Sequence, residues 1–250
     1  MMKLLRAIAL LLPVLLCRAA FADVIYSHMP LQGAVVTCSM PFDSQFSWRA
    51  RCDVCGWISR DVHNDFGTSG ISRHAFTCPD CGVRRESVFV NSTRSVKAPE
   101  VGASVYFHSA DGCIITEDNP FDTQFGYRVR CGGCGALSGT FSSFGSSGSS
   151  QRSYTCSKCG HRQSYALQHY TGRIRDLSTL YSHCAITGAV ITEMNPFDSQ
   201  FSYAPVCAGC GFRGSRTSTF GTSGASERSW SCPKCGHRQK ILLENWSKRR

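Results

Sequence analysis

The chain has 250 residues, and its 27 Lys and Arg residues exceed its 17 Asp and Glu residues to give a formal charge of +10. A basic surplus of this kind points toward nucleic acid as a partner. After the first 22 residues no apolar run reaches the roughly 20 residues that a membrane-spanning helix needs. We therefore expect no transmembrane span in the mature chain.

The first 22 residues have the pattern of a secretory signal peptide. Lys3 and Arg6 provide a positive start, residues 7–17 are an apolar run, and Ala20 to Ala22 fit an A-x-A cleavage site. The run is too short to span a bilayer. We expect an exported protein, periplasmic or secreted; the alternative is a short uncleaved anchor.

Short β-rich segments separated by turn residues come next in the chain. Residues 24–28 and 34–38 predict two strands, and Pro30 and Gly33 between them predict a hairpin. Further strands are expected at residues 47–51, 57–62, 72–77 and 87–90. No segment has the apolar periodicity of a long helix. The expected fold class is all-β, with small antiparallel units.

This pattern occurs three times along the chain. The segment Pro-Phe-Asp-x-Gln-Phe begins at Pro41, Pro120 and Pro196. The segment Phe-Gly-x-Ser-Gly begins at Phe66, Phe144 and Phe220. A period this long and regular indicates tandem duplication of one module. We expect modules at residues 23–97, 98–175 and 176–250.

Each repeat contains two C-x2-C pairs separated by 21 or 22 residues. The twelve cysteines are Cys52, Cys55, Cys78 and Cys81 in the first repeat, Cys131, Cys134, Cys156 and Cys159 in the second, and Cys207, Cys210, Cys232 and Cys235 in the third. One tight turn aims both sulfurs of a pair at a single ion, and the glycine after each pair permits a positive φ. Four thiolates form the closed shell of a structural zinc site. We expect three Zn²⁺ ions per chain.

The cysteine turns resemble those of the zinc-ribbon fold group. The resemblance rests on C-P-x-C-G at Cys78 and Cys232 and on C-S-K-C-G at Cys156, each with its upstream C-x2-C pair. It covers about half of each repeat and implies three tandem zinc-ribbon-like antiparallel β modules stabilised by metal. Zinc ribbons serve transcription, translation, enzymes and binding modules alike, so the resemblance says little about function.

The zinc sites also change the meaning of the charge. Removing Lys3, Arg6 and Arg18 with the signal peptide lowers the charge from +10 to +7. Four thiolates around one Zn²⁺ carry about −2, so three sites bring the mature chain to about +1. Nucleic acid remains an alternative partner, but a disfavoured one.

Cysteine pairs in an exported protein have a second interpretation. Oxidising compartments favour disulfides, so the C-x2-C pairs are alternatively those of a periplasmic thiol/disulfide oxidoreductase. A thioredoxin-like site places C-x-x-C at a helix N-terminus in an α/β pattern, which this sequence lacks. We expect zinc and no catalysis. Cys38, Cys113 and Cys184 remain outside both patterns, and we expect them to be small buried apolar side chains. Their odd number also leaves room for one disulfide and one free thiol, or for an intermolecular bridge.

The repeated polar loops are the candidates for recognition. In Pro-Phe-Asp-x-Gln-Phe the acidic and amide residues are Asp43, Gln45, Asp122, Gln124, Asp198 and Gln200. One interpretation is an Asx-type turn flanked by core phenylalanines; the other is a recognition loop presented three times. Three weak copies gain affinity by avidity. We expect a multivalent binding protein whose partner is a protein or a cell-envelope component.

Overall fold

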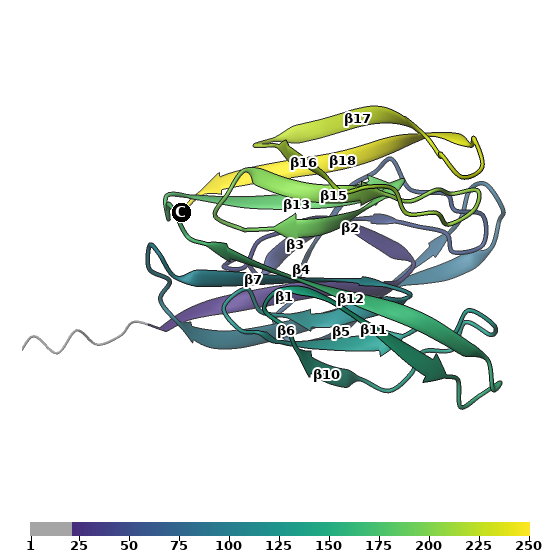
Figure 1. Cartoon of the computed structure of the whole chain (residues 1–250), viewed down its shortest axis with the longest axis horizontal. Coiled ribbons are helices and arrows are strands. Elements are labelled where there is room, and N and C mark those ends of the chain that lie inside the picture. Colours follow the sequence, from purple (N-terminus) through teal and green to yellow (C-terminus); the bar gives the residue numbers. More distant parts are fainter. Residues whose placement is uncertain (1–21) are drawn as a thin grey trace, which may run out of the picture.

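The computed structural model describes residues 22–250, which form strands and loops and contain no helix (Figure 1). Within these residues eighteen strands make six three-stranded antiparallel sheets. The expected all-β fold class is confirmed. The signal peptide predicted for residues 1–22 lies outside the described residues except for Ala22.

Each repeat contributes six strands. The first repeat has β1 (Ala22–Gln32), β2 (Ala34–Ser39), β3 (Gln45–Ala50), β4 (His63–Phe66), β5 (Gly70–Thr77) and β6 (Arg84–Lys97). The second has β7 (Ser104–Asp111), β8 (Cys113–Asp118), β9 (Gln124–Val129), β10 (Phe141–Phe144), β11 (Gly148–Thr155) and β12 (Arg162–Arg173). The third has β13 (Thr179–Thr187), β14 (Ala189–Met194), β15 (Gln200–Pro205), β16 (Thr217–Phe220), β17 (Gly224–Ser231) and β18 (Arg238–Arg249).

The six strands of a repeat divide into two sheets in the same way each time. One sheet has its last strand in the centre, in the orders β1-β6-β5, β7-β12-β11 and β13-β18-β17. The other has the orders β2-β3-β4, β8-β9-β10 and β14-β15-β16. The first strand and the second strand of every repeat therefore belong to different sheets.

Two of the predicted local structures are wrong. The hairpin expected from residues 24–28 and 34–38 does not form, because β1 pairs with β6 and β2 pairs with β3. Gly33 instead turns the chain from one sheet into the other, where a Cβ atom would lie only 2.1 Å from the Glu86 carbonyl oxygen. The strand expected at residues 57–62 is reduced to a single bridge between Ile58 and Arg51.

The two sheets of each repeat enclose a small apolar core. In the first repeat it contains Phe46, Trp48 and Phe89, all at most 4% exposed. The equivalent clusters are built on Phe125, Tyr127 and Leu167 in the second repeat, and on Phe201, Tyr203 and Leu243 in the third. The second phenylalanine of Pro-Phe-Asp-x-Gln-Phe is thus a core residue in every repeat.

The three repeats pack into a closed ring. The second strand of one repeat lies against the first and last strands of another: β8 on β1 and β6, β14 on β7 and β12, and β2 on β13 and β18. The three interfaces use equivalent strands in the same order, which gives the molecule approximate threefold symmetry. Figure 1 shows the strands of the third repeat, in green to yellow, lying against those of the first two.

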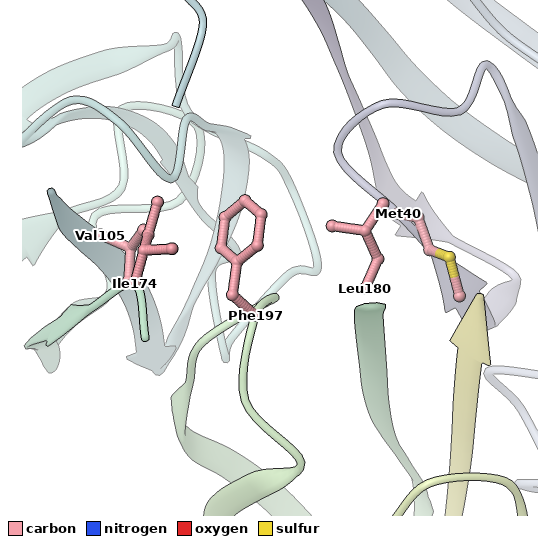
Figure 2. Close-up of a cluster of buried hydrophobic side chains, with 5 residues drawn as sticks. All are labelled: Met40, Val105, Ile174, Leu180 and Phe197. Atoms are coloured by element: carbon pink, nitrogen blue, oxygen red, sulfur yellow. The ribbon is translucent and has the colours of Figure 1, made fainter. Parts of the chain in front are cut away.

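A fourth core lies where the repeats meet. Figure 2 shows Phe197 between the pair Val105 and Ile174 on one side and Leu180 on the other, with Met40 beyond it. These residues come from all three repeats and are at most 6% exposed. The first phenylalanines of the repeated loops, Phe42, Phe121 and Phe197, form a triangle with ring centroids 6.0–6.2 Å apart. The repeats therefore share one apolar centre in addition to their own cores.

Candidate metal centres and repeated loops

The twelve predicted cysteine ligands come together in three groups of four, one group in each repeat. Within a group all four sulfur atoms lie within 4.8 Å of one another. The two turns of a group face each other so that sulfurs approach in crosswise pairs at 3.5–3.7 Å, namely Cys52–Cys81, Cys55–Cys78, Cys131–Cys159, Cys134–Cys156, Cys207–Cys235 and Cys210–Cys232. Each group could hold a metal ion.

The sulfur separations fit tetrahedral coordination. With a zinc–sulfur distance of about 2.3 Å, tetrahedral geometry places the sulfurs about 3.8 Å apart. A disulfide would bring them to about 2.05 Å. The observed 3.5–3.7 Å agrees with four ligands around one ion and leaves the crosswise pairs unbonded.

Backbone geometry explains why C-x2-C-G forms each turn. After the first turn of repeat 1, the Gly56 N–H donates to the Cys52 carbonyl at 2.9 Å, with φ at +78°. The glycines of the other five turns have φ between +68° and +73°, where other residues are strained. The backbone N–H groups of Cys55 and Val54 point at Cys52 and lower the pKa of its thiol to about 7. The thiolate is the form that binds a metal, so these N–H groups favour the ligating form of Cys52.

Each group lies between the two sheets of its repeat, because its first turn follows the second sheet's central strand (β3, β9 or β15) and its second turn connects two strands of the first sheet (β5 to β6, β11 to β12 or β17 to β18). The first cysteine of every turn is buried and the second is exposed, so the centres lie at the edge of the core. A side chain from the last strand holds the first turn: Gln163 accepts from the Gly132 N–H at 2.7 Å, and Gln239 accepts from the Ala208 N–H at 2.8 Å. In the first repeat Arg85 takes this place by donating to Asp53 at 2.8 Å.

A histidine on the first strand of each repeat, His28, His108 or His183, has a structural role. His28 contacts Asn91 and the Asp43 carbonyl at 3.0 and 3.3 Å, and His183 makes the equivalent contacts with Asn245 and Asp198. In the second repeat His169 replaces the asparagine, and His108 instead contacts Asp118 at 2.6 Å and the Gly145 carbonyl at 2.9 Å. Each ring also stacks on the core phenylalanine of its repeat, with centroids 4.2–4.4 Å apart.

The aspartates of the candidate recognition loops form Asx turns. Asp43, Asp122 and Asp198 each accept a hydrogen bond from the backbone N–H two residues later, at 2.9–3.0 Å. Those N–H groups belong to Gln45, Gln124 and Gln200, whose side chains face solvent fully or in part. The carboxylates thus shape the loop.

The second repeated segment lies beside the first. The Gly67 N–H donates to the Ser44 carbonyl at 2.9 Å, and Gly145 and Gly221 make the equivalent bonds to Thr123 and Ser199. At Gly67 a Cβ atom would lie 2.4 Å from the Asn91 side chain, so only glycine fits. The repeated Phe-Gly-x-Ser-Gly segment is therefore explained by the fold rather than by the metal.

The structure adds three residues of the second repeated segment to the six candidate residues of the first. Phe66, Phe144 and Phe220 are 68%, 67% and 70% exposed. Each lies directly opposite a loop glutamine on the neighbouring strand, in the pairs Gln45–Phe66, Gln124–Phe144 and Gln200–Phe220. Opposite residues of antiparallel strands share one face. The repetition of this phenylalanine was visible in the sequence, but its exposure depends on the short outer strand that carries it.

No helix among residues 22–250 is long and apolar enough to cross a membrane. Comparisons of the chain with protein-family models, with curated proteins and with solved structures found no significant match.

Proposed function

We propose that this is an exported, non-catalytic protein that holds three structural Zn²⁺ ions and binds a protein or cell-envelope component through three copies of one surface. The four-cysteine groups support zinc, because thiolate sulfurs at tetrahedral spacing favour it. Four protein ligands leave no open position on the ion for a substrate.

The observation that carries the binding function is the repeated glutamine–phenylalanine pair. Single exposed apolar side chains are normal on any protein. Here the same phenylalanine is 67–70% exposed in all three repeats and faces the same amide each time. An aromatic ring beside an amide offers apolar contact and hydrogen bonds, the combination typical of interface anchors.

The ring places the three pairs around one centre. Each pair belongs to a loop whose neighbouring phenylalanine lies in the central triangle of Phe42, Phe121 and Phe197. Threefold-related copies lie at the same level along the symmetry axis. A partner that contacts more than one copy would gain avidity over the affinity of a single copy.

A capture experiment tests this function. The zinc-loaded protein is immobilised, exposed to envelope and culture-fluid fractions of the producing cells, and the partner it retains is purified. Its dissociation is then measured from wild-type protein and from variants with one, two or three of Phe66→Ser, Phe144→Ser and Phe220→Ser. We expect the dissociation rate to rise with each substitution, by about tenfold or more in the triple variant.

A matched control replaces three exposed apolar residues that are not repeated, in the variant Val24→Ser, Val62→Ser and Val101→Ser. This control should bind like the wild type. Equal dissociation from the triple phenylalanine variant would refute the proposed surface. Retention of nucleic acid at physiological salt would favour the disfavoured alternative, and turnover of a disulfide substrate would favour the oxidoreductase.

A further inference from the structure

Among residues 22–250 three cysteines lie outside the metal groups, and two of them meet at one interface. Cys113 lies in β8 and packs against the core of the second repeat. Cys38 lies in β2, and Cys184 lies in β13. β2 packs on β13, which is the interface between the first and third repeats.

A single hydroxyl group connects the two thiols. Ser182 accepts a hydrogen bond from the Ser39 N–H at 3.1 Å, and its oxygen lies 3.8 Å from the sulfur of Cys184. Burial raises the pKa of Cys38 to about 11, although a hydrogen bond with Ser182 opposes the rise. Burial likewise raises the pKa of Cys184 to about 12, and Cys38 is one of the charges that act on it. Cys38 directly precedes Ser39 on β2, and Cys184 lies two residues after Ser182 on β13, so both half-buried thiols lie beside the Ser182 hydroxyl.

The other two interfaces show that this pairing is specific. Glu117 and Glu193 stand at the positions equivalent to Cys38, and Met29 and Ser109 stand at the positions equivalent to Cys184. Cysteine occurs on both sides of the interface only between the first and third repeats.

The interface between the first and third repeats also differs from the other two because no chain segment of the described residues connects its two sides. A chain segment links β6 to β7 at residues 98–103, and another links β12 to β13 at residues 174–178. No segment links the third repeat back to the first, since they contain the two ends of the described chain. The ring is closed there by noncovalent contacts, including the ion pair of Lys248 and Asp43 at 2.7 Å.

We propose that Cys38 and Cys184 form a disulfide that closes the ring covalently between the first and third repeats. The two thiols lose two protons and two electrons as the sulfur–sulfur bond forms. A small-molecule or protein disulfide accepts the electrons and is released as two thiols. Because the bond closes a long loop, it restricts the unfolded chain strongly and stabilises the folded ring.

The test uses a protein of residues 23–250, saturated with zinc and kept in a small excess of free zinc. The protein is incubated with oxidised glutathione, denatured in the presence of an alkylating agent, digested without reductant and mapped by mass spectrometry. We expect a cross-linked peptide containing Cys38 and Cys184, with Cys113 recovered as the alkylated thiol. Oxidation should raise the melting temperature by about 5–10 °C, and reductant should reverse the rise.

Two variants separate the cross-link from a general effect of oxidation. Cys184→Ser should abolish both the cross-linked peptide and the oxidant-dependent rise in melting temperature. Cys113→Ser should keep both. Recovery of Cys38 and Cys184 as separate alkylated or glutathionylated peptides from the wild type would overturn the proposal, and so would a cross-link from either residue to Cys113.

Discussion

Arg49 and Glu244, 195 residues apart in the chain, form a salt bridge of 2.8 Å that ties β3 of the first repeat to β18 of the third. Their side chains are only 18% and 8% exposed. Arg49 also donates to the Ser59 carbonyl at 3.3 Å. The pair lies at the interface that has no chain link, so it contributes to the closure of the ring.

Breaking the Arg49–Glu244 pair should lower the free energy of unfolding more than breaking an exposed ion pair does. Arg49→Met leaves the buried Glu244 carboxylate without its partner, and we expect the free energy of unfolding in urea to fall by about 3–5 kcal/mol. Arg73→Met, which removes an exposed partner of Glu86 (side chains 57% and 50% exposed), should cost about 0–1 kcal/mol. The double variant Arg49→Met/Glu244→Met should recover much of the loss. Equal effects of the two arginine substitutions would contradict a buried role for Arg49.

The metal content should equal one zinc ion for each of the three four-cysteine groups. Elemental analysis of protein purified without chelator should give about three zinc ions per chain. The twelve ligand thiols should react with a thiol reagent slowly until a chelator is added and rapidly afterwards. Protein that contains no metal and has its C-x2-C pairs oxidised would disprove the structural-zinc proposal.

Loss of one site tests how far the repeats depend on one another. Cys134→Ser should remove one zinc ion and most of the folding free energy that it supplies to the second repeat. The sequence alone suggests that the other repeats then stay intact. The shared centre changes this expectation, because Val105 and Ile174 of the second repeat bury apolar surface against Phe197 and Leu180 of the third.

We therefore expect the melting temperature of the whole molecule to fall in Cys134→Ser, with NMR signals of all three repeats affected. The matched substitution Cys113→Ser leaves every metal group complete and should change the melting temperature much less. Undisturbed signals from the first and third repeats in Cys134→Ser would show that the central cluster contributes little.

Within each repeated loop the glutamine should contribute to partner binding and the aspartate to folding stability. Replacing Gln45, Gln124 and Gln200 together by alanine should weaken partner binding while zinc content and melting temperature stay nearly unchanged, since these side chains face solvent fully or in part. Replacing Asp43, Asp122 and Asp198 by alanine should instead lower the melting temperature, because each carboxylate accepts a backbone N–H. A large loss of stability in the glutamine variant would mean that recognition lies elsewhere.

The second repeat should respond to pH differently from the third. Burial disfavours the charged form of His108, but the hydrogen bond with Asp118 and its negative charge outweigh burial and raise the pKa of His108 above its ordinary 6.5. Burial lowers the pKa of His183, which faces Asn245 instead. In an NMR titration, His108 should therefore change state at higher pH than His183.

The contributions of His108 and His183 to folding stability should therefore depend on pH in opposite directions. The stabilising effect of the His108–Asp118 pair is fully present below pH 6.5 and is lost as pH rises through the raised pKa of His108. The contribution of neutral His183 is instead lost as pH falls through its lowered pKa. Asp118→Asn should bring the pKa of His108 down and remove its part of the pH dependence. An unchanged His108 titration in that variant would contradict this assignment.

Local sequence was enough to identify the three four-cysteine groups that could hold a metal ion. A C-x2-C-G turn is specified by its own backbone, since the glycine adopts a positive φ and its N–H bonds to the first cysteine carbonyl. Two such turns within one short repeat leave few alternatives for their partners. The Asx turn at Asp43 and the absence of long helices from residues 22–250 also follow from local sequence, and both agree with the structure.

The tertiary structure decided which strands pair and how the repeats assemble. The segment around Gly33 suits a hairpin or a corner equally well, and only the long partner strand β6 selects the corner. The polar residues 91–97 of β6 gave no sign that the strand continues to Lys97. The partial burial of Phe42, the exposure of Phe66 and the placement of Cys38 and Cys184 at one interface all depend on contacts between distant segments. Sequence therefore determined the turns and their four-cysteine groups, whereas long-range packing decided the ring and the surface it presents.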